Sequence, residues 1–321
     1  MKILLIGNTR LGDAIISTCI LNYYSGKNVE ITVVCSPLSK EVYEIFSIVK
    51  KIITIVKKKR GKHWIEVYRK LDKVKWDLVI DLRNTIISRI IRKKNIFRLS
   101  NSHKYEHKVV SMCKLINLNY NIAPQIPVNE KDKFIALKII KKIGFNKDIL
   151  VVAPVTNWRR KNWPLKNFAL LINKLIKKDS IFKSIILLGS ENEKKECNQL
   201  KVMIKNSKVY NMSGKYDLKT ISAILRHCKL FIGNDSGLMH LAAASNIKTL
   251  GLFGPSREEN YRPWGKKSYY LRTKKSYDEL VLNKEYNRHH DSSLMTSLNV
   301  STVYKKCLEI DLLEIPLYSS N

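Results

Sequence analysis

Residues 233–240 read GNDSGLMH and bring together two glycines, a carboxylate, a hydroxyl and an imidazole. They lie between an apolar run that predicts a buried strand and a run that predicts a helix. Asp235 or Ser236 can cap this helix, and Gly237 leaves room for a ligand to approach the backbone. Because the amides of a helix N-terminus attract anions, the segment is a candidate cradle for a phosphate or diphosphate, with His240 one turn further on. An ordinary capped turn with a core histidine is the competing interpretation.

A second polar segment, residues 8–17 (NTRLGDAIIS), also follows an apolar strand and opens a helix. Its Gly12-Asp13 pair lies at the junction, just after Arg10. Asp13 is either the N-cap of the helix or, at the mouth of a cleft, a general base. The dinucleotide-binding pattern G-x-G-x-x-G is absent here and elsewhere in the chain.

A third segment, residues 153–164 (APVTNWRRKNWP), follows another expected strand. The hydroxyl of Thr156 and the ammonium group of Lys161 could together clamp a diphosphate. The alternative is a solvated basic loop that is anchored by Trp158 and Trp163.

Apolar strands alternate with helices along most of the chain, which predicts parallel sheets covered on both faces. The pattern weakens between residues 95 and 130 and then resumes. We therefore expect two doubly wound α/β domains, residues 1–147 and 148–321, the second of which ends in a helix at 301–311. Ligands of such domains bind at the carboxyl ends of the strands. Strands are expected at residues 2–7, 30–36, 52–56, 77–83, 148–155, 184–189, 209–214, 229–233 and 248–254.

The chain of 321 residues carries 59 Lys and Arg against 27 Asp and Glu, a formal net charge of +32. Such a charge suits nucleic acid, an anionic membrane surface or phosphorylated substrates, although a composition biased towards Lys, Ile and Asn explains it equally well. The charge is spread along the chain, with dense pieces at residues 57–62, 92–94 and 159–161. No recognised nucleic-acid module accompanies it, so we expect no specific nucleic-acid partner.

The six cysteines show neither CxxC nor Cys/His metal spacing, which predicts a reduced compartment and no metal site. The N-terminal sequence does not resemble a signal peptide. No apolar run approaches the roughly 18 residues of a membrane-spanning helix. The sequence therefore predicts a cytoplasmic protein, either free or on a membrane surface.

Taken together, these segments resemble glycosyltransferase family 9, the ADP-heptose:lipopolysaccharide heptosyltransferases and their relatives. The matching pieces follow one another in order across nearly the whole chain. They are RLGDAIIST near the start, WDLVIDLR (76–83), KNWP (161–164), LLGSENEKKE (187–196), NMSGKYDLKTISAIL (211–225), GNDSGLMHLAAA (233–244) and FGP (253–255).

The resemblance implies a GT-B fold, in which two Rossmann-like domains face an interdomain cleft, the first binding the acceptor and the second the nucleotide sugar. It implies an inverting, metal-independent transfer, most directly of heptose from ADP-heptose onto a lipopolysaccharide core or a similar lipid-linked glycan. No cofactor is implied, because the nucleotide-diphosphate sugar is itself the donor substrate. Such an acceptor would place the enzyme peripherally at the inner face of the cytoplasmic membrane, against anionic lipids.

By the same resemblance, Asp13 is the general base that takes the proton of the attacking hydroxyl. Lys161 acts in catalysis by stabilising the leaving diphosphate without a metal, together with Thr156 and the helix start near Ser236. We expect Asp235 to cap the helix or to bond sugar hydroxyls, because its carboxylate would repel phosphates. The implied substrate-binding residues are Arg10, Gly12, Thr156, Asp235, Ser236, Gly237 and His240.

Three positions depart from the family pattern. Cys19 stands where proline is common, and Val155 stands in the phosphate loop where glycine is common. Leu294-Met295 replaces a Cys-Met pair within a weakly matching stretch, residues 277–300, which leaves the identity of the sugar open. A nucleotide-sugar epimerase on the same two-domain fold is the alternative enzyme, and a nucleic-acid-binding protein is the alternative from another class.

Overall fold

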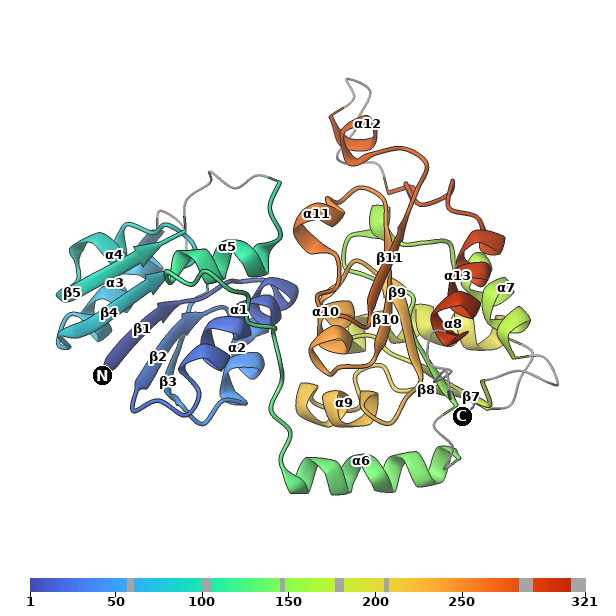
Figure 1. The fold of residues 1–321 in the computed structure, drawn as a ribbon, viewed down its shortest axis with the longest axis horizontal. Helices are drawn as coiled ribbons and strands as arrows, with labels where there is room; N and C mark the ends of the chain where they lie inside the picture. Colours follow the sequence, from blue (N-terminus) through green and yellow to red (C-terminus); the bar gives the residue numbers. More distant parts are fainter. Residues whose placement is uncertain are drawn as a thin grey trace, which may run out of the picture. The chain divides into compact units, whose positions relative to one another are not determined.

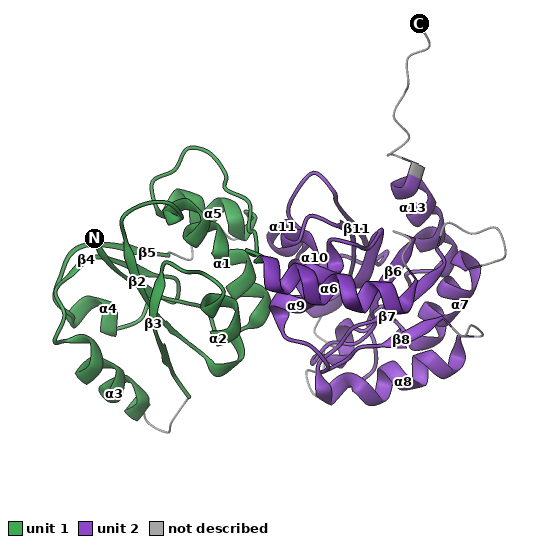
Figure 2. Cartoon of the chain, turned by 90° about the horizontal axis from the view of Figure 1, so that it is seen from below, with its two compact units in different colours: residues 1–129 green, residues 130–321 purple. Residues whose placement is uncertain are grey.

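The computed structural model describes residues 1–56, 61–99, 105–144, 148–176, 182–204, 208–282 and 291–312. The chain divides into two compact units, residues 1–129 and 130–321 (Figure 2). The division falls before the domain boundary expected at residue 147, because helix α6 (Glu130–Ile143) packs against α9 (Leu218–Leu225) of the second unit. Most of the basic run at residues 57–62 and part of the weakly matching stretch lie outside the described residues.

The first unit is built on a five-stranded parallel sheet with the order β3-β2-β1-β4-β5 (Figure 1). The strand order reverses at β1, and right-handed crossovers then place the connecting helices on opposite faces of the sheet. Its strands are β1 (Lys2–Ile6), β2 (Glu30–Cys35), β3 (Val49–Thr54), β4 (Trp76–Asp81) and β5 (Lys93–Arg98). Its helices are α1 (Leu11–Tyr24), α2 (Pro37–Glu44), α3 (Lys62–Leu71), α4 (Ile87–Ile90) and α5 (Lys108–Leu115).

The second unit is built on a six-stranded parallel sheet with the order β11-β10-β9-β6-β7-β8. Its buried core joins the central strands to α7, α8 and α13. Its strands are β6 (Ile149–Ala153), β7 (Ser184–Leu187), β8 (Val209–Asn211), β9 (Leu230–Asn234), β10 (Lys248–Phe253) and β11 (Ser268–Arg272). Besides α6 and α9, its helices are α7 (Leu165–Leu175), α8 (Lys194–Met203), α10 (Gly237–Ala244), α11 (Glu258–Tyr261), α12 (Tyr277–Val281) and α13 (Val300–Leu312).

Each strand expected from the sequence is present, with its bounds shifted by a few residues. The sequence pattern missed β5 and β11, each of which forms an edge of its sheet. An edge strand is only half covered, so it needs no continuous apolar run. The segment KKNIFR of β5 accordingly has three partly buried and three exposed positions and no fully buried one.

Three adjacent strands, β6, β9 and β10, bring the polar loops that follow them to one edge of the sheet of the second unit. Gly233 of β9 pairs with Ala153 of β6 on one side and with Gly251 of β10 on the other. Gly251 lets α10 lie close to the sheet, because a Cβ at this position would come within 2.5 Å of the sulfur of Met239. The loops after β6 and β9 therefore leave the sheet side by side. Of the helices in the described ranges, none combines the length with the hydropathy that a bilayer crossing requires.

Candidate active site

The first component of the site is the N-terminus of α10, where β9 gives way to the helix. Ser236 is the N-cap residue, and its Oγ accepts a hydrogen bond from the Met239 amide at 3.4 Å. The expectation that Asp235 caps the helix is therefore wrong, because the neighbouring hydroxyl fills that position. The first amides of α10 have no intrahelical acceptor, as at any helix start. Those that Ser236 does not bind remain able to donate to an anion.

Asp235 instead forms an ion pair with Lys161, which comes from the loop after β6. The Asp235 side chain is 6% exposed and the Lys161 side chain is 21% exposed. The Nε2 atom of His240 lies 3.9 Å from the other carboxylate oxygen of Asp235. Asp235 thus holds the ammonium group of Lys161 beside the start of α10. That group has three N–H donors, and its ion pair with one carboxylate oxygen does not use all of them.

Asn234 ties the two loops together, a role that the sequence analysis did not assign. Its side chain is fully buried at the end of β9. Its amide nitrogen donates to the Pro154 carbonyl at 2.8 Å, and its carbonyl oxygen accepts from the Trp163 amide at 3.0 Å. The only signal in the sequence was a polar residue that directly continues an apolar strand. Because Asn234 bonds to both ends of the 154–163 loop, it fixes where Lys161 projects.

Thr156 contributes to the loop in a different way from the one expected. Its Oγ1 lies 2.9 Å from Oδ1 of Asn162 and 3.0 Å from the Trp158 carbonyl, and its amide donates to the same Asn162 oxygen at 2.8 Å. Both neighbours of the hydroxyl are acceptors, so its single proton is used inside the loop. In this structure Thr156 stabilises the segment that carries Lys161 through these hydrogen bonds.

The weakly matching stretch at residues 277–300 packs against this same loop where it is described. Ser293 Oγ donates to the Asn162 carbonyl, and the Trp163 indole N–H donates to the Leu298 carbonyl at 2.8 Å. These two hydrogen bonds join residues that are 131 and 135 positions apart in sequence, so a distant segment of the chain supports the loop. No local sequence pattern could have revealed this contact.

In the first unit, Asp13 lies at the third position of α1. Arg10 is the N-cap residue and makes no capping bond through its side chain, and Gly12 lies between them. Asp13 is therefore not the N-cap, which was one of the two roles considered for it. The side chain is half-buried. Burial raises the pKa of the Tyr43 hydroxyl, and the negative charge of Asp13 makes a smaller contribution in the same direction.

Residues 64–288, well over half of the chain, match the family model for glycosyltransferase family 9 (heptosyltransferase). The chain belongs to glycosyltransferase family 9. This membership confirms the family and the enzyme class expected from the sequence motifs, so the protein is a glycosyltransferase.

Individual relatives agree with this membership. The chain is 30% identical to lipooligosaccharide heptosyltransferase 2 of Campylobacter jejuni over 283 residues, which cover 82% of this chain and 85% of the relative. A solved family 9 glycosyltransferase from Veillonella parvula superposes with a TM-score of 0.80 at 20% identity, covering 97% of each chain. The ADP-heptose lipopolysaccharide heptosyltransferase II of Escherichia coli superposes with a TM-score of 0.72 at 19% identity, covering 98% of this chain and 99% of that one. At these identities the two structures establish the fold, which confirms the expected GT-B class.

Within the family 9 chain, the structure brings Lys161, Asp235, Ser236 and His240 together in the second unit. Gly237 is the first residue of α10 in the same cradle. Arg10, Gly12 and Asp13 form a separate group at the start of α1 in the first unit. Among the described residues, no group of three or more His, Cys, Asp or Glu side chains is placed so that it could hold a metal ion.

The cap at Ser236 gives a first testable expectation. Ser236→Ala removes the acceptor for the Met239 amide and should cost about 1 kcal/mol of stability. For a unit of this size, that loss lowers the melting temperature by about 2–4 °C. A thermal melt followed by circular dichroism measures the change. Ser301→Ala, at an exposed position of α13, is the matched control and should leave the melting temperature within about 1 °C. Equal melting temperatures for the two variants would contradict the capping role.

Proposed function

We propose that this chain transfers a heptose from ADP-heptose onto a lipopolysaccharide core or a similar lipid-linked glycan, with inversion at the anomeric carbon and without a metal ion. The observation that carries the proposal is the Lys161–Asp235 ion pair at the start of α10, in a chain of family 9. Two of its relatives support the donor and acceptor classes, since one is an ADP-heptose lipopolysaccharide heptosyltransferase and the other is a lipooligosaccharide heptosyltransferase.

The leaving group explains why a cation and a helix N-terminus belong together. As the bond between the anomeric carbon and the diphosphate breaks, negative charge grows on the phosphate oxygens. The ammonium group of Lys161 and the first amides of α10 are fixed donors that can receive this charge without rearranging. Asp235 is buried against Lys161 and orients it, so the carboxylate does not need to face the phosphates. This arrangement supplies fixed N–H donors to the developing negative charge without a metal ion.

The attacking group requires a base, and we assign that role to Asp13. The acceptor hydroxyl oxygen forms the new bond to the anomeric carbon while the carbon–oxygen bond to the diphosphate breaks. The hydroxyl proton passes to the Asp13 carboxylate, and ADP leaves with the electron pair of the broken bond. A single displacement of this kind inverts the anomeric configuration. The hydroxyl becomes strongly acidic only as its bond to carbon forms, so an ordinary carboxylate is basic enough.

We further propose that the enzyme acts in the cytoplasm, at the inner face of the membrane that holds its acceptor. Its formal charge of +32 supports this location. Each basic side chain near an anionic leaflet contributes about 1 kcal/mol to the free energy of membrane binding. A flotation assay with vesicles that contain phosphatidylglycerol should recover the protein, and vesicles of phosphatidylcholine alone should not.

A donor panel tests the proposed reaction. ADP-heptose should raise the melting temperature more than GDP- or UDP-sugars, because a ligand at 100 times its Kd stabilises the folded state by about 2.7 kcal/mol. In the presence of EDTA and an acceptor glycan, NMR of the product should show inverted configuration at the new linkage. Selective stabilisation by a UDP- or GDP-sugar would contradict the donor assignment. Loss of transfer in EDTA would contradict the absence of a metal, and conversion of the donor without any acceptor would favour the epimerase alternative.

A further inference from the structure

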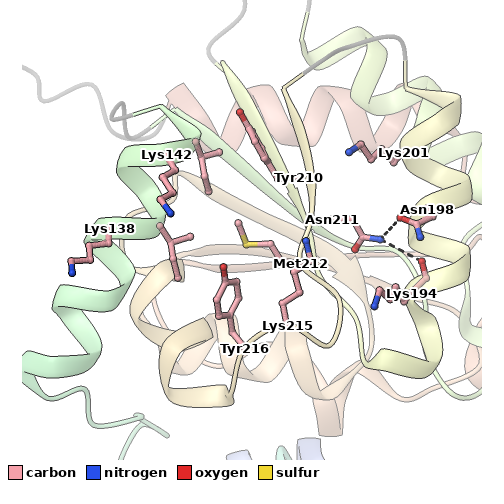
Figure 3. A pocket seen from close by; sticks show the side chains of 12 residues that line it. Lys138, Lys142, Lys194, Asn198, Lys201, Tyr210, Asn211, Met212, Lys215 and Tyr216 are labelled. Atoms are coloured by element: carbon pink, nitrogen blue, oxygen red, sulfur yellow. Dashed lines mark hydrogen bonds between the residues drawn. The ribbon is translucent and has the colours of Figure 1, made fainter.

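A hollow in the second unit shares no residue with the site described above. It has a volume of about 400 Å³ and lies beside β8, the edge strand of the six-stranded sheet (Figure 3). Helix α6 forms one wall, helix α8 forms the opposite wall, and the turn after β8 closes the end. A volume of this size is within the range of small-molecule pockets. Its lining residues are Lys138, Ile139, Lys142, Ile143, Lys194, Asn198, Lys201, Tyr210, Asn211, Met212, Lys215 and Tyr216.

The charge of this lining is one-sided, because it contains five lysines and no Asp or Glu. Lys194 pairs with Glu191, at 2.8 Å. In the described part of the chain, no ion pair forms at the other four lysines, which come from α6, α8 and the turn. Like charges gathered around one hollow repel each other, and a bound anion would remove that repulsion.

The walls of the pocket are fixed before any ligand arrives. The side-chain amide of Asn211 donates to Oδ1 of Asn198 at 2.7 Å and lies 3.3 Å from the Lys194 carbonyl, which joins β8 to α8 (Figure 3). Gly214 has a φ of +68°, and a Cβ there would lie 2.8 Å from the Cα of Glu191. The turn that carries Lys215 is therefore packed directly against the segment before α8, so binding would require little ordering of the backbone.

The chemistry of the lining indicates the class of ligand. Lysine ammonium groups bind phosphate as point charges, and several of them spaced around a pocket suit an anion with more than one phosphate group. The floor adds the apolar surfaces of Met212 and Tyr216, so a ligand with a carbon skeleton also fits. We propose that this pocket binds an organic phosphate with two or more negative charges, either soluble or presented by a lipid headgroup, at a site separate from that of the sugar donor.

Charge reversal on the two helical walls tests the proposal in the full-length chain. The pocket variant is Lys142→Glu/Lys201→Glu, with one change on α6 and one on α8. The matched control is Lys131→Glu/Lys195→Glu, which alters exposed lysines of the same two helices that do not line the pocket and changes the net charge equally. All four side chains are exposed, so both proteins should fold and melt as the unchanged protein does.

The probe is inorganic tripolyphosphate, measured by isothermal titration calorimetry in the background Lys161→Met/Asp235→Asn, which lacks the donor-site ammonium group and leaves no buried carboxylate without its cation, so that binding at the donor site contributes little. The pocket variant should lose at least about tenfold in affinity, because two attractive charges become repulsive, and the control should lose less than about threefold. A parallel arm measures flotation with phosphatidylglycerol vesicles. If the pocket variant loses binding in the calorimeter but floats as the control does, the ligand is a soluble phosphate. If the pocket variant also loses flotation, and tripolyphosphate inhibits the flotation of the control, the ligand is a lipid headgroup. If the pocket variant and the control behave alike in both arms, the proposal is overturned, whatever the outcome of the donor panel.

Discussion

Asp13→Asn is expected to lower kcat for heptose transfer by about 10²–10⁴-fold, the usual contribution of a positioned general base. Asparagine keeps the shape of the side chain but cannot accept the proton of the acceptor hydroxyl. Asp13 lies on α1 in the first unit, whereas Lys161 and the α10 cradle belong to the second unit. ADP has no acceptor hydroxyl for Asp13 to deprotonate, so its affinity should stay within about twofold of that of the unchanged protein. Steady-state kinetics and calorimetry with ADP measure the two quantities.

Glu44→Gln provides the matched control for Asp13→Asn. Glu44 is another carboxylate of the first unit, pairs with Lys40 on the surface of α2, and is 45% exposed. This change should leave kcat unchanged, since exposed ion pairs contribute little. If Asp13→Asn retained more than about a third of normal turnover, another group would have to act as the base.

The second large effect concerns the Lys161–Asp235 pair, for which stability and activity should separate. Lys161→Met leaves the Asp235 carboxylate buried without its cation, which should destabilise the second unit by up to about 3 kcal/mol, a value reduced because Lys161 is partly exposed. It should also lower kcat by about 10²–10³-fold through the loss of a donor to the leaving diphosphate. Adding Asp235→Asn removes the buried charge, so the double variant should recover most of the stability.

The double variant Lys161→Met/Asp235→Asn should nevertheless remain at least about 100-fold slower than the unchanged enzyme, because the ammonium group is still missing. Thermal melts and transfer kinetics on Lys161→Met, Asp235→Asn and the double variant form a complete double-mutant cycle. Lys166→Met, at an exposed position of α7, is the control and should affect neither quantity. Recovery of activity together with stability in the double variant would show that Lys161 serves only to neutralise Asp235.

The sequence was informative wherever one segment determines its own structure. Ser236 was one of two candidate caps, and the strand-to-helix junction that positions it was predicted at the correct place. The apolar runs of the buried strands predicted the parallel sheets, because a strand covered on both faces must be apolar throughout. The edge strands β5 and β11 escaped detection because their half-exposed positions carry no such pattern.

The sequence was uninformative wherever the partner of a residue lies far away along the chain. Asp235 was expected to cap the helix or to bond sugar hydroxyls, and its ion pair with Lys161 was not foreseen because the two residues are 74 positions apart. Thr156 was expected to face a ligand, whereas its hydroxyl proton bonds within its own loop. The support that Ser293 gives to the same loop depends on a sequence separation of 131 residues. Periodicity and capping rules describe neighbours along an element, so contacts of this kind become visible only in the folded structure.

The most direct measurement is a crystal structure of the chain with bound ADP-heptose or an unreactive analogue. We expect the diphosphate oxygens to accept hydrogen bonds from the backbone amides at the start of α10 and from Nζ of Lys161, while the Asp235 carboxylate stays against Lys161. A complex in which the phosphates bind away from residues 236–239, or in which Lys161 points away from them, would contradict this expectation.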